Sequence, residues 1–373
     1  MLGFNQLIAK MAQTNRIGYI DALRGLTMIL VVFSHIYIPN DTPLNMFLVN
    51  LRMPMFFFIS GFLSFRMTQT WSGRETLSRL GSKVRTMIIP AVSVGLIYTA
   101  IYRGELYLNF FTHLTHKGYW FTLALFNMLL FYYIARWLHE RRAKTTLPQF
   151  TRRLHIVALI LLMACSDMSI LGNVDKIFTM SFTFRYLHFF VFGLVCSCNR
   201  EWFEGMFDKS IKMGAMIVTL FLLSWVVIWG KSNPELVQAY IGVQWFYILK
   251  AVLIAIIGYC GIFTIFGFFR RYGDFFSENK IIGKPLQFVG RNTLDVYLLH
   301  YFVLLGMPTF LYPYVAGTDN LLIPLIVGMV VAVAIVAVSL LISRILRLSD
   351  HVAYYILGAR DVKLGEDKNT TKQ

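Results

Sequence analysis

The chain has 373 residues, of which 57% are apolar and only 14% are Asp, Glu, Lys or Arg, and its mean hydropathy is +0.60. A soluble domain of this length needs far more charge to cover its surface, so the composition excludes that class. Apolar stretches of about 18 residues or more recur along the chain and are typical of transmembrane helices, whereas a barrel would show short alternating segments. The net charge of +16 does not indicate nucleic-acid binding, because the cations lie in short loops between apolar stretches. The expected partner is the lipid bilayer.

These stretches predict an all-α, polytopic membrane protein with about ten transmembrane helices. The helices form a single domain over residues 1–364, and the polar tail at 365–373 is expected to be disordered. In chain order, the helices are expected at 19–38, 48–66, 86–102, 119–137, 154–172, 181–198, 211–230, 246–268, 291–311 and 321–346.

Lys and Arg are distributed unevenly among the connecting loops. The N-terminal arm, the even-numbered loops and the C-terminal tail are rich in them, whereas the first and ninth loops contain none. Because positively charged loops stay on the cytoplasmic side, the alternation predicts that both termini are cytoplasmic. It also orients the first helix with its N-terminal end inward.

The first helix carries three ionisable side chains, Asp21, Arg24 and His35. A charge in the hydrocarbon core costs a few kcal/mol or more, so each of them is a candidate for a functional role. Arg24 and His35 are eleven residues apart, which places them on one helix face and about 16 Å apart along the axis. Asp21 is expected to hold Arg24 in place. The alternative is an interfacial Asp21–Arg24 ion pair with His35 as a packing residue.

Further polar side chains lie in or beside the other expected helices. Arg52 precedes Pro54, which is expected to kink or start the second helix, and Ser60 and Gly61 offer a small-residue surface. Snorkelling explains Arg52 as well as a site role does, and interfacial anchoring equally explains the aromatic residues of the fourth helix. The residues expected to bind substrate are Arg52, Ser60, His116, Tyr119, Trp120, Arg185 and His300.

Five segments in chain order resemble the acyltransferase family 3 membrane proteins. They are RIGYIDALRGLTMILVVFSH, RMPMFFFISGFL, GYWFTLALF, LHFFVFGLV and VGRNTLDVYLLH, which together span about residues 16 to 300. The resemblance implies ten helices with cytoplasmic termini, in the inner membrane of a bacterium. It also implies transfer of an acyl group, usually acetyl from acetyl-CoA, to a hydroxyl of an envelope polysaccharide or its lipid-linked precursor. The family's Arg-x-x-Arg element between helices two and three is replaced by a different spacing of Arg79, Lys83 and Arg85.

Under this interpretation, Arg24, Lys83 and Arg85 bind the phosphates or the pantetheine entrance of acetyl-CoA or another acyl-CoA. No metal is expected. His35 acts as general base on the acceptor hydroxyl, because an imidazole titrates near neutral pH, and a covalent acyl-histidine is the less favoured alternative. Arg52, or a backbone N–H near Pro54, stabilises the developing oxyanion.

A proton-coupled transporter or flippase of an envelope precursor is the alternative function. Intramembrane Arg, His and Asp side chains also suit such a protein. Transporters often contain inverted repeats with paired broken helices, and no matched halves are evident in this sequence. Acyl transfer is therefore the function that the sequence favours.

Overall fold

The computed structural model describes residues 17–36, 43–65, 71–103, 118–142, 145–164, 178–208, 210–232, 235–236, 239, 242–311, 313–314 and 322–358. Regular structure in these ranges is helical, with no strand, as the apolar stretches predict. Each of the ten expected ranges overlaps a helical segment of the described residues, and parts of some, such as 165–172, lie outside those residues. The long helices are α2 (Gly18–Ile36), α3 (Pro43–Ser64), α7 (Trp120–Arg142), α8 (Leu147–Ala164), α10 (Met180–Cys198), α12 (Ser210–Ser232), α14 (Val243–Arg271) and α19 (Leu322–Leu346).

Shorter helices complete the fold. They are α4 (Gly73–Lys83), α5 (Ile89–Tyr98), α11 (Arg200–Gly205), α15 (Gly273–Glu278), α16 (Gly283–Arg291), α17 (Thr293–Leu305) and α20 (Asp350–Tyr355). Seven helical segments of the described chain are long and apolar enough to cross a membrane, and two shorter apolar ones lie at Lys212–Val226 and Thr293–Leu305. The chain is therefore a helical protein suited to a membrane, whereas the count of ten crossings and the side of the termini stay predictions.

The structure departs from the expected boundaries at several helix ends, and the second and third expected helices differ most in how they begin. The third expected helix begins earlier, at Gly73, where Ser72 and Glu75 form a reciprocal capping box. A π-helical segment, Val84–Ile88, then joins α4 to α5 without a break. Pro54 lies inside α3, so the second helix does not start there.

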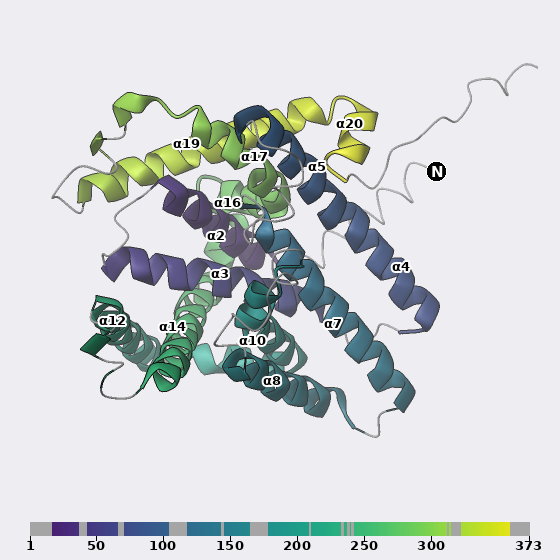
Figure 1. Cartoon of the computed structure of the whole chain (residues 1–373), viewed down its shortest axis with the longest axis vertical. Coiled ribbons are helices and arrows are strands. Elements are labelled where there is room, and N and C mark those ends of the chain that lie inside the picture. Colours follow the sequence, from purple (N-terminus) through teal and green to yellow (C-terminus); the bar gives the residue numbers. More distant parts are fainter. Residues whose placement is uncertain are drawn as a thin grey trace, which may run out of the picture.

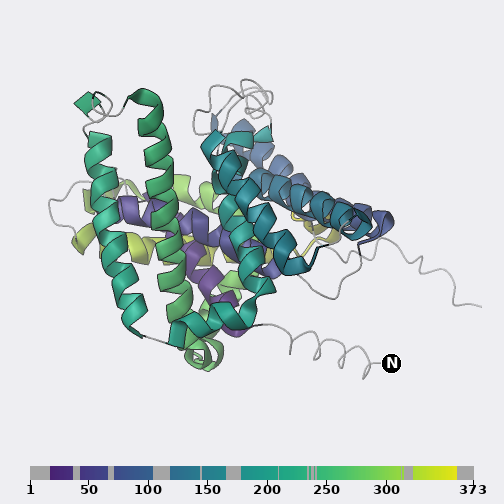
Figure 2. The ribbon, with the colours of Figure 1, turned by 90° about the horizontal axis from the view of Figure 1, so that it is seen from below.

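Helix α2 occupies the middle of the helical assembly (Figure 1) and packs against α3, α14, α15, α16, α17 and α19. Helices α12 and α14 form an antiparallel pair at one side of the molecule (Figure 2). The polar residues of α2 are thus surrounded by protein, as their cost in lipid requires.

Two helix crossings in this core depend on glycine. A Cβ on Gly25 of α2 would overlap the carbonyl oxygen of Leu286 in α16, and a Cβ on Gly290 would overlap that of Asp21. In the same way, a Cβ on Gly61 of α3 would overlap the carbonyl oxygen of Phe190 in α10, and a Cβ on Gly193 of α10 would overlap that of Phe58 in α3. Small residues let the backbones approach closely, which is the role expected for Gly61. These crossings fix α2 and α3 relative to their neighbours.

One ion-pair cluster ties the start of α2 to two other elements. Glu204 of α11 accepts hydrogen bonds from Tyr19 at 3.3 Å, from Arg200 Nε at 2.6 Å and from Arg270 Nε at 2.9 Å. Partial burial acts to raise the pKa of Glu204, but Arg200 and Arg270 outweigh it and hold that pKa below its ordinary value.

Candidate active site

Helices α2 and α17 carry the candidate site, and they run in the same direction. Near the start of both, Arg24 Nη2 donates a hydrogen bond of 2.9 Å to Thr293 Oγ1. Further along, the Tyr301 hydroxyl lies 3.3 Å from His35 Nε2. Because α2 is unbroken from Gly18 to Ile36, Arg24 and His35 sit on one continuous helix, separated by about 16 Å of helical rise. Helix α17 therefore follows the whole Arg24-to-His35 face.

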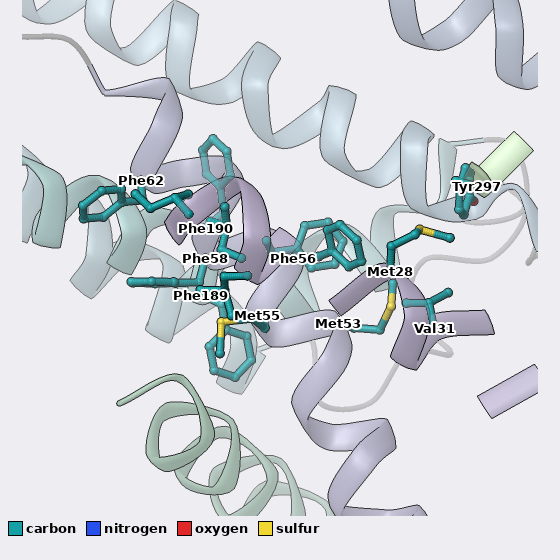
Figure 3. Packing of buried hydrophobic residues seen from close by; sticks show 14 of the residues in the cluster. Met28, Val31, Met53, Met55, Phe56, Phe58, Phe62, Phe189, Phe190 and Tyr297 are labelled. Atoms are coloured by element: carbon teal, nitrogen blue, oxygen red, sulfur yellow. The ribbon is translucent and has the colours of Figure 1, made fainter. Parts of the chain in front are cut away.

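A cavity of about 340 Å³ lies between α2, α3, α7, α17 and the α4–α5 helix. It is large enough for a small-molecule ligand. Along α2, its wall passes from Arg24 through Met28 to Val31, which covers about 10 Å of helix. In Figure 3, Met28, Val31 and Met53 lie together where α2 and α3 meet. The lining residues are Arg24, Met28, Val31, Met53, Phe56, Ser60, Leu63, Ser64, Lys83, Thr86, Met87, Phe121, Thr122, Leu125, Leu129, Thr293, Leu294 and Tyr297.

The chemistry of the cavity changes along its length. Arg24 and Lys83 are the charged side chains among the described lining residues, and both are cationic. Thr293, which holds Arg24, lies with them, whereas the wall toward Val31 is formed largely by Met and Phe side chains. This arrangement suits an anionic group at the Arg24 end, followed by a less polar chain that extends toward His35.

A cluster of polar side chains lies one helical turn beyond Val31. The His35 ring lies 5.4 Å from the His300 ring and 5.2 Å from the Tyr301 ring, measured between centroids. Arg52 Nη1 donates to the Val31 carbonyl oxygen at 3.3 Å, and its charge interacts with His35, His300 and Tyr301. The structure thus brings together three residues that were predicted separately, His35, Arg52 and His300.

Tyrosine side chains hold the residues just before α7 against α17. The Tyr119 hydroxyl donates to the Leu298 carbonyl oxygen at 3.0 Å, and the Tyr297 hydroxyl donates to that of Gly118 at 2.8 Å. Gly118 has a φ of +110° and faces the Tyr301 ring so closely that a Cβ there would overlap it. Tyr119 is fully buried and holds α17 in place, while Tyr297 also lines the cavity.

Other predicted residues do not line the cavity. Trp120 stacks on Phe182 with centroids 4.2 Å apart, and Arg185 is exposed in the second turn of α10. Arg85 lies over the Tyr354 ring at 5.7 Å and does not line the cavity, whereas Lys83 does. His116 lies outside the described residues. The Asp21–Arg24 contact stays a prediction.

Three site residues were missed by the sequence reasoning, namely Thr293, Tyr297 and Tyr301. They recur every four residues on α17 and so share a face of an otherwise apolar helix. Hydroxyl groups at that spacing in a membrane helix were the signal that could have found them. No group of three or more His, Cys, Asp or Glu side chains that could hold a metal ion occurs in the described part of the chain. The side chains around His35 supply imidazole, guanidinium and hydroxyl groups.

A family model described as an acyltransferase domain matches residues 17–344. No curated protein and no solved structure matches the chain. The family match covers α2 through most of α19, and therefore every element that forms the cavity and the His35 cluster. The chain belongs to the acyltransferase family 3.

Proposed function

We propose that this membrane acyltransferase moves an acyl group, most simply acetyl, from cytoplasmic acyl-CoA to a hydroxyl of a cell-surface polysaccharide or its lipid-linked precursor. One observation carries the proposal: a cavity with two cations at one end leads along α2 to within one helical turn of the partly buried imidazole of His35. The proposed location is the inner membrane of a bacterium, where the donor is made on one side and the acceptor is assembled on the other.

The cavity suits the donor in its charge and in its direction along α2. Arg24 and Lys83 offer a guanidinium and an ammonium group to the CoA phosphates or to the pantetheine entrance. The apolar wall formed by Met28, Val31 and Met53 suits the pantetheine arm, which is about as long as the 16 Å of helix between Arg24 and His35. Acyl-CoA, when bound in this way, supplies a thioester whose carbonyl carbon lies beside His35.

The residues around His35 suit transfer of the acyl group to an alcohol. His35 takes the proton from the acceptor hydroxyl as the hydroxyl oxygen attacks the thioester carbonyl carbon. Arg52 donates to the carbonyl oxygen while negative charge develops on it. His35 then returns the proton to sulfur as the carbon–sulfur bond breaks, so the products are an ester and a free thiol. Tyr301, 3.3 Å from Nε2, keeps the His35 ring oriented through this exchange.

Replacement of His35 tests the proposal most directly. We expect H35A to abolish acyl transfer while the protein is still made and inserted. The measurement is mass spectrometry of envelope polysaccharide from cells that contain the wild-type protein, H35A or no protein, with acetyl gain as the readout. The matched control is H351A, because His351 is exposed on α20, far along the chain from the site. Acetylation that survives in H35A would contradict the role of His35.

The same experiment separates acyl transfer from transport. A flippase would move an envelope precursor without consuming acyl-CoA, so the polysaccharide would gain no acetyl group. Loss of the protein would then change the amount of polysaccharide at the surface and leave its acetyl content per sugar unchanged. We expect the opposite result: in cells without the protein, the amount of surface polysaccharide is unchanged and its acetyl content per sugar falls.

A further inference from the structure

His300 is a second imidazole at the site, and its protonation pattern is fixed by the backbone. The side chain is fully buried, and Nδ1 lies 3.1 Å from the Val296 carbonyl oxygen and 2.8 Å from that of Tyr297. A carbonyl oxygen can only accept, so Nδ1 must carry the proton. In the neutral ring, Nε2 is therefore a hydrogen-bond acceptor that points away from its own helix.

This acceptor has no partner in the described part of the chain. His300 Nε2 is buried and makes no hydrogen bond there, and neither does Arg52 Nε. Buried polar atoms are nearly always hydrogen-bonded, and exceptions near a reaction centre indicate a place for a ligand. The His300 ring lies 5.4 Å from the His35 ring, and Arg52 bonds to the Val31 carbonyl oxygen one turn before His35, so both unpaired atoms belong to the same site.

The two atoms need different partners. Arg52 Nε is a donor and suits the thioester carbonyl oxygen, which can only accept. His300 Nε2 is an acceptor and needs a group that carries a proton. The thioester group itself carries none, which leaves the acyl acceptor and the amide N–H of the pantetheine arm as sources of that proton. Of the two, the acceptor reacts beside His35, whose ring lies 5.4 Å from that of His300. The reacting hydroxyl has a single proton, which His35 removes, and a second donor is therefore needed.

We propose that His300 Nε2 binds the acyl acceptor through a second hydroxyl, next to the one that His35 deprotonates. This inference rests on the proposed function and narrows the acceptor to a molecule with two neighbouring hydroxyls, as on a sugar ring. The His35 and His300 ring centroids are 5.4 Å apart, a spacing that matches two adjacent hydroxyls, each about 2.8 Å from its own ring nitrogen. A simple monohydroxy alcohol would leave Nε2 unpaired and would be a poor acceptor.

Three substitutions of His300 separate binding from proton transfer. The amide of H300Q can place an oxygen near the position of Nε2 but cannot titrate. The shorter H300N keeps a polar group near Nδ1 and loses the acceptor at Nε2, while H300F keeps the ring volume without either nitrogen. Full-length protein in membranes is given radiolabelled acetyl-CoA, and envelope vesicles from cells that lack the protein serve as acceptor. The KM for each substrate, kcat and the pH profile of kcat are measured, with thermal unfolding as the control for folding.

We expect H300N and H300F to lower kcat/KM for the vesicle acceptor by about ten- to a hundredfold, as the loss of a hydrogen bond to a buried group does. H300Q should retain most of the wild-type value. The KM for acetyl-CoA and the pH profile should not change in any of the three variants. If H300F does not fold, the comparison of H300Q with H300N gives the same answer. NMR of the product should place the acetyl ester next to a free hydroxyl.

Several outcomes would overturn the inference. Equal loss of kcat in H300Q and H300N would assign proton transfer to His300, and a raised KM for acetyl-CoA would show that Nε2 binds a pantetheine amide instead. Acceptor kinetics unchanged in H300F would leave His300 with a packing role. In each of these cases the wild-type protein still transfers label. A wild-type protein that transfers no label would instead contradict the proposed function itself.

Discussion

Helices α2 and α16 meet backbone to backbone, whereas α12 and α14 meet through apolar side chains. Gly25 and Gly290 have carbonyl oxygens against their α-carbons, while Gly214 of α12 has open space around it. Between α12 and α14 lies a small cluster centred on Leu220 and Ile257. Much of α12 is exposed, including the large side chains Ile217, Val218, Phe221, Leu222, Trp225 and Val226.

This difference separates two regions with different tasks. The α2–α16 crossing must keep the site residues at fixed distances, whereas α12 must present an apolar surface to the lipid. A close crossing fixes the distance between Arg24 and Thr293 within narrow limits, since neither backbone can move inward. Side-chain packing on α12 leaves more freedom, and an apolar outer surface is what hydrocarbon requires. Substitutions on α12 should therefore change stability and activity little, whereas substitutions at the α2–α16 crossing should lower both.

The largest expected effect follows from filling that crossing. G25A should lower stability by about 1–3 kcal/mol and abolish transfer, because the new methyl group must push α16 away from α2. Thermal unfolding in detergent and acetyl transfer are the measurements. G214A, the matched control on α12, should leave the stability unchanged or raise it by up to about 1 kcal/mol, because alanine favours a helix and the new methyl group has open space around it. Equal effects of the two substitutions would remove the distinction between the two regions.

A smaller loss is expected where α17 is tied to α19. Asp295 accepts hydrogen bonds from Ser343 at 2.6 Å and from Arg347 Nη2 at 2.9 Å. Because Arg347 is 39% exposed, D295N should cost only about 1–2 kcal/mol, with a fall in kcat as α17 loosens around His300 and Tyr301. D350N, at an exposed carboxylate of α20, is the control, and a wild-type melting temperature in D295N would speak against this tie.

The cationic end of the cavity allows a prediction about substrate binding alone. T293V removes the hydroxyl that accepts from Arg24 and keeps the shape of the side chain. We expect the KM for acetyl-CoA to rise about fivefold to tenfold with little change in kcat, since the loss of one such bond is worth about 1 kcal/mol. T219V on α12 should leave both constants unchanged. A change confined to kcat would place Arg24 at the reacting atoms instead.

The smallest effect concerns pH. The Glu204 carboxylate is favoured in the folded protein, so its stabilisation is present above the ordinary pKa of Glu, about 4.3, and is lost as the pH falls through the lower folded value. The wild type should therefore lose more stability than E204Q between pH 5 and pH 3, by less than about 1 kcal/mol because both arginines are 44–45% exposed. Parallel pH dependence of thermal unfolding in the two proteins would contradict this.

Local periodicity made part of the site predictable. The eleven-residue spacing placed Arg24 and His35 on one face of one helix, and the intramembrane cost of charge singled out Arg52 and His300. The helical fold and the family followed from the apolar stretches and the five motifs. These inferences need only the residues of a single helix and their spacing.

Contacts between helices that are distant in the sequence could not be predicted from the spacing of residues within one helix. Tyr301 lies beside His35 because glycine lets α16, and α17 after it, approach α2, and no local pattern reports that distance. Arg85 and Lys83 looked equivalent in the sequence, yet only Lys83 lines the cavity. Trp120 was predicted at the site from its place in the chain, while its ring stacks on Phe182. In each of these cases, the position of the side chain depends on how the helices pack against one another.

The π-helical segment Val84–Ile88 has a consequence for how insertions and deletions act on this protein. A π turn contains about one residue more than an α turn, so the segment takes up one extra residue while α4 and α5 keep nearly the phase of one continuous α-helix. Deletion of one residue there would restore an ordinary α-helix and leave α4 where it is, whereas the same deletion inside α5 would turn everything before it by about 100°. Lys83 would stay in the cavity wall in the first case and leave it in the second. The π segment is thus the place in this long helix where a one-residue deletion changes the local backbone without moving the cation of the cavity wall.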